Sequence, residues 1–326
     1  FSCMGKTDSY KQMDELVTNF ASFLQNDLGL KKGDRIALQM PNVLQYPIAM
    51  FGALKAGLII VNTNPLYSER EMHHQFVDAE CKAIVILANF AHHLEKILHE
   101  TKIEHVVVTE IGDMLNFPKN KVVNFVVKNV KRMVPSYNLP KAYSFSEALE
   151  LGAQKSFATI PMNLDDIAFL QYTGGTTGVS KGATLTNRNI VANMEQICLW
   201  MLPLLKEGEE IAITALPLYH IFSLTVNACA IMKYGGHNVL ITNPRDMGAF
   251  IKELKKVKFS VITGVNTLFN GLLHQPAFCA LDFSSLKISI AGGMALQKAV
   301  AQRWQDVTKT KIAEGYGLTE TSPVAT

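Results

Sequence analysis

The sequence predicts an α/β protein built on mostly parallel β-sheet, and three observations support this class. Short apolar runs typical of buried strands alternate with amphipathic stretches of helical periodicity. Glycine-rich or polar residues follow several of the strand-like runs, where α/β sheets commonly place their sites. The chain has 326 residues, of which 48% are hydrophobic and 18% charged, so it can bury one large core or two moderate ones.

The first third of the chain alternates strands with helices in the order that crossover units require. Thr7 or Asp8 is expected to cap a helix that runs to about residue 28, and Gly29 ends it. Ser68 and Glu71 form a capping box for a later helix. The other expected helices cover residues 43–56 and 92–99, and the expected strands cover residues 35–40, 58–61, 83–87 and 105–109.

The second half of the chain continues the same alternation. We expect a helix from Thr186 or Asn187 to about residue 199, and further helices over residues 248–256 and 297–309. The expected strands cover residues 167–170, 183–185, 209–216, 237–241, 260–263, 286–291 and 312–316.

A basic segment lies between the two halves. Residues 114–146 contain no acidic side chain, and their basic side chains are Lys119, Lys121, Lys128, Lys131, Arg132 and Lys141. Valines recur there at helical spacing, which predicts a basic amphipathic helix making peripheral contact with a membrane surface through residues 119–141. The alternative is an ordinary surface helix whose valines face the core. Pro135 and Pro140 end the segment, which is the best candidate for a linker.

Composition excludes several classes of protein. A net charge of +3 is too small to indicate a nucleic-acid-binding protein. No run of eighteen apolar residues occurs, so we expect a cytoplasmic protein that is at most peripheral on the inner face of the cell membrane. Five widely spaced cysteines without a C-x-x-C pair indicate reduced thiols rather than a zinc site. His73-His74 and His92-His93 are expected to be solvated, because adjacent helix residues point about 100° apart and rarely share a metal ion.

The strongest functional signal is the stretch of residues 167–182. An apolar strand leads through Tyr172 and Thr173 into a loop of glycines, hydroxyl side chains and one lysine. Glycine lets the backbone approach a ligand closely, and successive free N–H groups form a concave anion site. The ammonium group of Lys181 adds a mobile positive charge. The loop therefore predicts a site for a polyphosphate.

The spacing of this loop fits neither the Walker pattern nor the dinucleotide pattern. It does fit G-x-S-x-G at residues 178–182, the nucleophile elbow of α/β-hydrolases, with Ser180 as the nucleophile. That elbow needs a helix directly after the serine, whereas residues 183–185 read as extended. A hydrolase stays the alternative to a phosphate site.

Unusual residues follow four of the expected strands, at 173–181, Tyr219-His220, Gly292-Gly293 and 315–320. A doubly wound sheet brings such strand ends together along one edge. We therefore expect these four stretches to form one site.

Four ordered stretches resemble motifs of the adenylate-forming superfamily, which includes acyl-CoA synthetases, luciferases and peptide-synthetase adenylation domains. They read YTGGTTGVSKGATLTNRN, ALPLYHIF, AGGMAL and EGYGLTETSP. The similarity runs over essentially the whole chain. The detailed sequence, including NFVVKNVKR, ITNPRD and TGVNTLFN, is most similar to bacterial long-chain-fatty-acid–CoA ligases.

This resemblance implies the large N-terminal domain of the adenylate-forming fold, with two mostly parallel sheets, helices packed on them and a smaller β subdomain. Residues 1–160 would form a first α/β subdomain, and residues 161–326 a second one with the phosphate loop. The family's ribose-binding aspartate and its C-terminal lid domain with a catalytic lysine find no match in residues 1–326. We therefore expect these residues alone to bind ATP weakly and not to turn over.

The resemblance also implies a two-step reaction. A fatty acid and ATP give an acyl-adenylate and pyrophosphate, and coenzyme A then displaces AMP to form a thioester. Magnesium ion is expected with the nucleotide phosphates, since it prefers oxygen ligands. The step joins two anions, so positive charge and aligned donors would carry the catalysis.

Residue roles carry over motif by motif. The phosphates would be held by Tyr172, Thr173, Gly174, Gly175, Thr176, Thr177, Gly178 and Lys181. Tyr316 would stack near the adenine, and the base would be lined by Gly292, Gly293, Glu314, Gly315 and Gly317. The catalytic residues would be Lys181, His220 beside the substrate carboxylate, Thr319 at the α-phosphate and Glu320 as the magnesium ligand.

Each role has a plainer reading in isolation. Gly292-Gly293 could serve only a tight turn, Glu320 could be a first-turn helix acid, and His220 could be a hydrogen-bonded core histidine. An amino-acid adenylation domain is a further alternative, although no aspartate stands at a recognisable place to bind a substrate ammonium group. A membrane-associated acyl-binding protein without catalysis, and a homodimer, are also left open.

Overall fold

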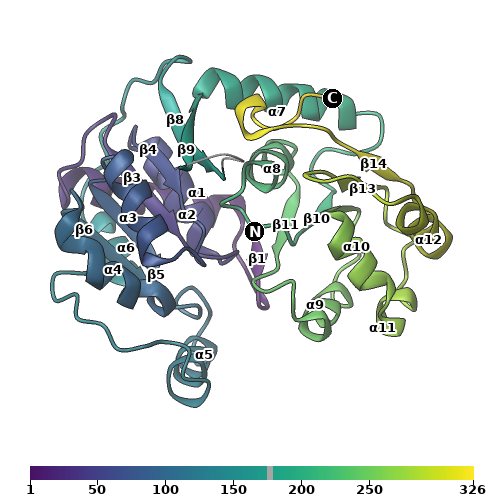
Figure 1. Ribbon diagram of the computed structural model, residues 1–326, viewed down its shortest axis with the longest axis horizontal. Helices are drawn as coiled ribbons and strands as arrows, with labels where there is room; N and C mark the ends of the chain where they lie inside the picture. The colour runs from purple at the N-terminus through teal and green to yellow at the C-terminus, as the bar shows by residue number, and fades with distance from the viewer. Residues whose placement is uncertain (175–178) are drawn as a thin grey trace. The chain divides into compact units, whose positions relative to one another are not determined.

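The computed structural model describes residues 1–174 and 179–326 (Figure 1). Gly175, Thr176, Thr177 and Gly178 of the expected phosphate loop therefore lie outside the described residues. The chain forms two compact units, each organised around its own sheet. The N-terminal unit comprises Lys6–Asn187, and the C-terminal unit comprises Phe1–Gly5 together with Arg188–Thr326.

The sheet of the N-terminal unit has the strand order β7-β6-β5-β3-β4-β8-β9. These strands are β3 (Arg35–Gln39), β4 (Ile59–Asn62), β5 (Ala83–Leu87), β6 (His105–Thr109), β7 (Tyr143–Ser144), β8 (Ile167–Thr173) and β9 (Lys181–Thr186). Neighbouring strands are parallel except β8 and β9, which form an antiparallel hairpin. The expected strands at residues 83–87 and 105–109 are confirmed at both ends.

The helices of the N-terminal unit are α1 (Tyr10–Asn26), α2 (Gln45–Lys55), α3 (Glu69–Asp78), α4 (Ala91–Ile97), α5 (Lys119–Phe125) and α6 (Phe145–Ala153). Short turns η1 (Ala88–Phe90) and η2 (Leu98–Glu100) flank α4, and the π-helical turn η3 (Val126–Val130) follows α5. The expected cap of the first helix at Thr7 or Asp8 is wrong. Thr7 lies in the short strand β2 (Lys6–Thr7), and Ser9 caps α1 through a capping box with Gln12.

Two helical layers enclose the N-terminal sheet. Phe76 of α3 and Leu94 of α4 pack into one buried cluster with strand residues such as Ile84. In a separate contact, α1 packs against α2 and α6, where the rings of Phe20 and Phe145 stack at 5.2 Å between centroids. Each fully buried phenylalanine stabilises the fold by about 1.5–3 kcal/mol.

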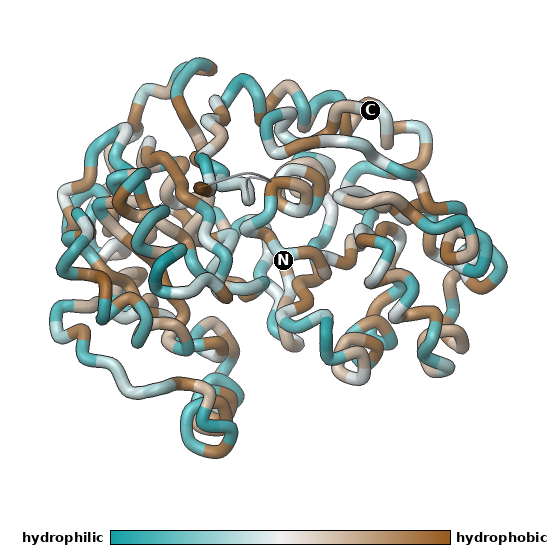
Figure 2. Tube along the Cα trace, viewed as in Figure 1, coloured by the Kyte–Doolittle hydropathy of each residue, from teal (hydrophilic) through white to brown (hydrophobic). Residues whose placement is uncertain are grey.

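The helical part of the basic segment, unlike the sheet and the helices that cover it, contains no buried residue. None of the residues of α5 or η3 is buried, and α5 projects away from the sheet of its unit in Figure 1. Phe117 is 82% exposed, Phe125 59% and Val130 65%. Hydrophobic and hydrophilic positions alternate along this stretch in Figure 2. None of the valines of α5 and η3 is buried, whereas Val134, which follows them, is partly buried against the cluster under α3 and α4.

The C-terminal unit is built on parallel strands in the order β14-β13-β12-β10-β11-β1. They are β1 (Ser2–Cys3), β10 (Ile211–Thr214), β11 (His237–Leu240), β12 (Val261–Gly264), β13 (Ile288–Ala291) and β14 (Ile312–Glu314). Its helices are α7 (Asn187–Met201), α8 (Ile221–Ser223), α9 (Met247–Leu254), α10 (Asn266–Leu273), α11 (Pro276–Cys279) and α12 (Lys298–Thr308), with the π-helical turn η4 (Leu224–Ile231) and the 3₁₀ turn η5 (Thr319–Thr321).

Two buried clusters form the core of the C-terminal unit. The first centres on Trp304, whose ring packs edge-on to Phe269 and whose indole N–H donates to Ser289 Oγ at 3.0 Å. The second joins Met201 of α7 and Ile231 of η4 to the sheet. Both clusters fix the helices that surround the carboxyl ends of the strands.

The unit boundary differs from the expected division at residues 160 and 161. It falls after Asn187, because β8 pairs with β4 and completes the N-terminal sheet together with β9. The expected phosphate loop therefore belongs to the N-terminal unit. Among the described residues, the strands all fall in these two sheets, and a separate smaller β subdomain is not found among them. No helix in the described part of the chain is long and apolar enough to span a bilayer.

Candidate functional site

The first candidate site is the hairpin of β8 and β9 in the N-terminal unit, which we call the glycine hairpin. Its register pairs Tyr172 with Gly182 and Thr173 with Lys181. Ser180 Oγ donates to the carbonyl oxygen of Thr173 at 2.6 Å, which ties the two strands together at the base of the loop. The antiparallel pairing thus brings the residue that enters the loop beside the lysine that leaves it.

Lys181 is exposed at the start of β9, and no carboxylate of the described residues forms an ion pair with its ammonium group. An ammonium group without a carboxylate partner is available for an anionic ligand. The described part of the loop therefore keeps the positive charge that a polyphosphate site needs.

Tyr172 stands at the other side of the loop, in β8. Its hydroxyl donates to Asp78 Oδ2 at 2.5 Å. Partial burial raises the pKa of Tyr172 far above its usual value, and the Asp78 carboxylate raises it further. The hydroxyl is therefore a fixed donor at every working pH.

The geometry around Ser180 does not support a hydrolase. Strand β9 follows Ser180 at Lys181, where a nucleophile elbow requires a helix. The Ser180 hydroxyl donates to a backbone carbonyl rather than to a histidine within the described residues. Ser180 closes the base of a loop, which is a structural role.

The second candidate site is a pocket of about 520 Å³ in the C-terminal unit, which we call the C-terminal pocket. This volume is in the range of small-molecule sites. Three of the expected stretches meet there, after β10, β13 and β14. The expected site residues that line it are His220, Gly292, Gly293, Glu314, Gly315, Tyr316, Gly317 and Thr319.

The expectation that all four stretches lie on the edge of one sheet is wrong. Three of them follow strands of the C-terminal sheet, whereas residues 173–181 belong to the N-terminal sheet. Within the C-terminal unit the edge rule holds, because parallel strands place their carboxyl ends on the same side.

His220 is held in one tautomer at the start of α8. Its Nδ1 accepts a hydrogen bond from the backbone N–H of Phe222 at 3.3 Å, which caps the helix. Desolvation by the surrounding protein lowers the pKa of His220 below its usual value. The imidazole is therefore neutral near pH 7, and the hydrogen bond assigns its proton to Nε2. His220 can offer one N–H donor to a ligand in the C-terminal pocket.

Glycines shape the wall of the C-terminal pocket. A Cβ atom on Gly292 would lie 3.1 Å from Phe222 Cε1, and one on Gly317 would lie 1.9 Å from the carbonyl oxygen of Pro323. Gly293 has φ of +78°, a conformation that favours glycine. At these positions a side chain would collide with a neighbour or strain the backbone, so glycine is required along this wall of the pocket.

Tyr316 and Glu320 lie near the end of β14 and are both exposed. The Tyr316 ring lines the C-terminal pocket and is 65% exposed, so an aromatic face is available to stack on a planar ligand. Glu320 belongs to η5, next to Thr319, but is not among the lining residues. Its carboxylate has no lysine or arginine partner in the described part of the chain, so an oxygen ligand that suits Mg²⁺ is available.

Sequence reasoning did not identify the residues of α7 that form the opposite wall of the C-terminal pocket. Asn193 is buried and holds Val324 by two hydrogen bonds, from Nδ2 to the carbonyl oxygen at 2.7 Å and from the Val324 N–H to Oδ1 at 3.1 Å. Trp200 also lines the pocket. The hydrogen bonds between Asn193 and Val324 join residues 131 positions apart, so no local sequence pattern predicts them.

Two of the four histidines in the sequence pairs His73-His74 and His92-His93 lie beside carboxylates. His73 pairs with Glu100 and His93 with Glu69, each at 3.1 Å. No group of three or more metal-ligating side chains occurs among the described residues.

The model of the AMP-binding enzyme family matches residues 2–326, so the chain belongs to that family.

Curated relatives named long-chain-fatty-acid–CoA ligase are similar over almost the whole chain. The protein from Escherichia coli is 54% identical over 324 residues, which cover 99% of this chain and 58% of the relative. The protein from Yersinia pestis is 52% identical over 326 residues, which cover 100% of this chain and 58% of the relative. The chain thus spans about 58% of the length of these relatives.

Solved structures show the same fold at low sequence identity. An anthranilate CoA ligase in complex with anthranoyl-AMP superposes with a TM-score of 0.83 at 19% identity, covering 99% of this chain and 57% of that one. A long-chain-fatty-acid-CoA ligase from Archaeoglobus fulgidus superposes with a TM-score of 0.79 at 21% identity, covering 99% of this chain and 61% of that one. The expected α/β class with two sheets is confirmed.

Proposed function

We propose that the protein containing this chain activates a long-chain fatty acid with ATP and transfers the acyl group to coenzyme A. The observation that carries this proposal is the C-terminal pocket, in which three motifs of the family meet around one neutral histidine. The curated relatives at 54% and 52% identity support the choice of a long-chain fatty acid as substrate.

The first step forms the acyl-adenylate. A carboxylate oxygen of the fatty acid attacks the α-phosphorus of ATP, the bond from that phosphorus to the bridging oxygen breaks, and pyrophosphate leaves with the electron pair. No proton moves in this step, so the protein must orient two anions and stabilise the charge between them. In the second step the thiol sulfur of coenzyme A attacks the acyl carbon and loses its proton, and AMP leaves.

The residues divide these tasks by charge. Lys181 and the donors of the expected phosphate loop would hold the β- and γ-phosphates, because an ammonium group and backbone N–H groups are attracted to phosphate oxygens. His220 would donate from Nε2 to the carboxylate of the fatty acid without adding a charge. Thr319 would contact the α-phosphate from the rim of the C-terminal pocket.

The adenine would lie in the C-terminal pocket. Its face would stack on Tyr316, which offers an exposed ring. Gly292, Gly293, Gly315 and Gly317 would let the backbone approach the base, with Glu314 beside them. Glu320 fits a magnesium ligand, and a bound Mg²⁺ would neutralise phosphate charge.

Pyrophosphate release by the full-length protein tests this proposal. We expect release that requires both ATP and a fatty acid, with the greatest kcat/KM among long chains. Twenty amino acids supplied one at a time should give only background release. Preference for an amino acid would favour amino-acid adenylation instead, and release that ignores every acid would overturn acyl activation.

A second proposal concerns the basic segment. We propose that residues 119–141 bring the protein to the inner face of the cell membrane from the cytoplasm. Exposed Phe125 and Val130 can enter the headgroup region, while Lys121, Lys128 and neighbouring basic side chains bind anionic lipids.

Sedimentation with vesicles tests the membrane contact. Wild-type protein should pellet with vesicles containing anionic phosphatidylglycerol and should be released by high salt. Phe125→Asp should abolish pelleting, whereas Val77→Asp, at an exposed position of α3, should not. Equal pelleting of the two variants would contradict the proposal. We also propose a homodimer, which light scattering of the protein without vesicles tests.

A further inference from the structure

Helix α3 contacts the glycine hairpin on both sides of the loop. His74 Nε2 lies 2.8 Å from the carbonyl oxygen of Ser180, the residue directly before Lys181. One turn further along α3, the carboxylate of Asp78 accepts a hydrogen bond from the hydroxyl of Tyr172, the residue directly before Thr173. The two contacts therefore meet the hairpin where the chain enters the loop and where it leaves.

We propose that His74 and Asp78 are positioning residues that fix the base of the loop and so aim Lys181 at the nucleotide phosphates. The proposal rests on the proposed function, because it gives the contact a purpose only if the loop binds ATP. Neither residue carries a role in the sequence motifs, and neither touches the nucleotide in this scheme.

The chemistry of the His74 contact is simple. A carbonyl oxygen can only accept, so Nε2 of His74 must carry a proton, as it does in one neutral tautomer and in the imidazolium form. The His74 ring also meets the Tyr172 ring edge-on, with centroids 6.4 Å apart and planes at 87°. His74 therefore touches both strands of the hairpin.

The Tyr172 contact fixes the opposite strand through a ring. A Cβ atom on Gly182 would lie 3.0 Å from Tyr172 Cε2, so the Tyr172 ring covers the backbone of Gly182 closely. The hydroxyl at the far end of that ring is held by Asp78. Because Gly182 directly follows Lys181, Asp78 restrains the lysine from the side opposite to Ser180.

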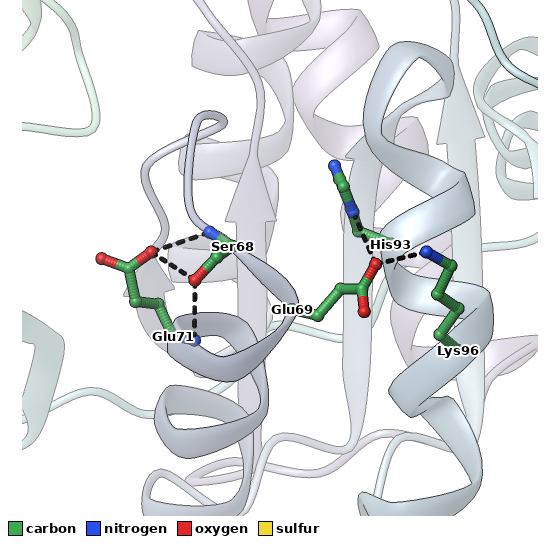
Figure 3. Close-up of polar contacts among 5 residues, drawn as sticks. All are labelled: Ser68, Glu69, Glu71, His93 and Lys96. Atoms are coloured by element: carbon green, nitrogen blue, oxygen red, sulfur yellow. Dashed lines mark hydrogen bonds and ion pairs between the residues drawn. The ribbon is translucent and has the colours of Figure 1, made fainter.

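Helix α3 is itself anchored independently of the loop. Its first turn carries the capping box of Ser68 and Glu71, and Glu69 accepts hydrogen bonds from His93 and Lys96 of α4 (Figure 3). These contacts lie at the end of α3 away from Asp78, so they hold the helix in place without touching the hairpin.

A buried chain of amides makes a third connection from α3 to the hairpin. Gln75 Nε2 donates to the carbonyl oxygen of Asn62 in β4 at 2.9 Å, and Asn62 Nδ2 donates to Gln171 Oε1 in β8 at 3.0 Å. All three side chains are buried. The base of the hairpin is thus held by a helix that has contacts at both of its ends, which preorganises Lys181 for a ligand.

His73 provides a matched control for His74. It is the same residue type, one position earlier in α3, and its Nε2 pairs with Glu100 rather than with the hairpin. We therefore compare His74→Ala with His73→Ala in the full-length protein, measuring pyrophosphate release and the melting temperature.

The expected result is a change in the KM for ATP without a comparable change in the KM for fatty acid. Loss of one hydrogen bond at the loop should raise the KM for ATP by about tenfold in His74→Ala, leave the KM for fatty acid within about twofold, and leave His73→Ala like wild type. His74→Gln, whose amide can donate to the same carbonyl, should recover most of the ATP affinity. Equal KM values for ATP in the two alanine variants would overturn the proposal for His74.

A double-mutant cycle tests the contact between Asp78 and Tyr172. Asp78→Ala and Tyr172→Phe should each raise the KM for ATP, and the double variant should be no worse than the more severe single one. Fully multiplicative effects would show that Asp78 does not act through Tyr172. Because these variants keep His74, the cycle tests the role of Asp78 even where His74→Ala fails to fold.

The outcomes separate this inference from the proposed function. Wild-type protein that releases no pyrophosphate with any acid would overturn the function and the inference together. Active wild-type protein with ATP kinetics indifferent to His74 and Asp78 would overturn the inference alone.

Discussion

His220 shows how one backbone hydrogen bond sets the charge of a side chain. Its Nδ1 accepts from the N–H of Phe222, and desolvation lowers its pKa. Protonation would place a second N–H where an acceptor is needed, so the neutral form is favoured in the folded protein. This contribution to stability is complete above the ordinary pKa of 6.5 and is lost as the pH falls through the lower folded value.

The first prediction follows from the lowered pKa of His220. In the pH profile of kcat/KM for the fatty acid, the acid limb assigned to His220 should lie below pH 6.5. His220→Gln should remove that limb and lower kcat/KM by roughly tenfold to a hundredfold, since one donor to the carboxylate is altered. A limb above pH 6.5, or one that persists in His220→Gln, would contradict this assignment.

Single residues were predictable where they belong to contiguous motifs. His220, Gly292, Tyr316 and Thr319 were identified from short stretches, and all of them line the C-terminal pocket. His74 was read only as a solvated helix residue, because its partner Ser180 lies 106 positions away in the chain. Contacts at such separation depend on strand pairing, which no local pattern contains.

Helix α3 connects the packing of the N-terminal unit to the candidate site, so its stability matters at the scale of an element. Ser68 caps the helix, with Glu71 N–H bound to Ser68 Oγ at 3.4 Å and Glu71 Oε2 bound to the Ser68 N–H at 2.8 Å. The hydrogen bonds from Ser68 lower the pKa of Glu71, which keeps its carboxylate ionised near the positive end of the helix dipole.

The second prediction concerns this cap. Ser68→Ala should lower the free energy of unfolding by about 1 kcal/mol, because it removes an N-cap acceptor. It should also raise the KM for ATP if fraying of α3 loosens the hairpin. Ser144→Ala removes an equivalent capping box from α6 and should cost a similar amount of stability without changing the KM. Urea unfolding and pyrophosphate kinetics measure both effects; a KM that rises equally in both variants would contradict the link.

Elements were predictable where side-chain pattern and burial agree. Strands β5 and β6 are runs of β-branched residues and were placed correctly at both ends. The basic segment has the right period for a helix, but its valines are not buried. Periodicity states which residues share a face of a helix and says nothing of whether another element covers that face.

The whole molecule divides where the sheets divide. The boundary expected at residue 160 followed from the resemblance to the adenylate-forming fold, whereas the observed one follows the pairing of β8 with β4. The glycine hairpin is thereby part of the N-terminal unit, although its sequence lies near the middle of the chain.

The third prediction belongs to this scale. The curated relatives are longer than this chain, which covers 58% of their length. Because residues 1–326 match only part of each relative, we predict that these residues alone show less than about a hundredth of the pyrophosphate release of a full-length relative. Circular dichroism should show that residues 1–326 are folded. Comparable rates for the two proteins would contradict this prediction.

The buried amides of Gln75, Asn62 and Gln171 have a consequence for local opening. None of these groups can be exposed alone without leaving a polar partner unsatisfied in the interior, so α3, β4 and β8 should come apart together. Backbone amides in the three segments would then exchange with deuterium at a common free energy. Heating would then release the base of the glycine hairpin in one cooperative step.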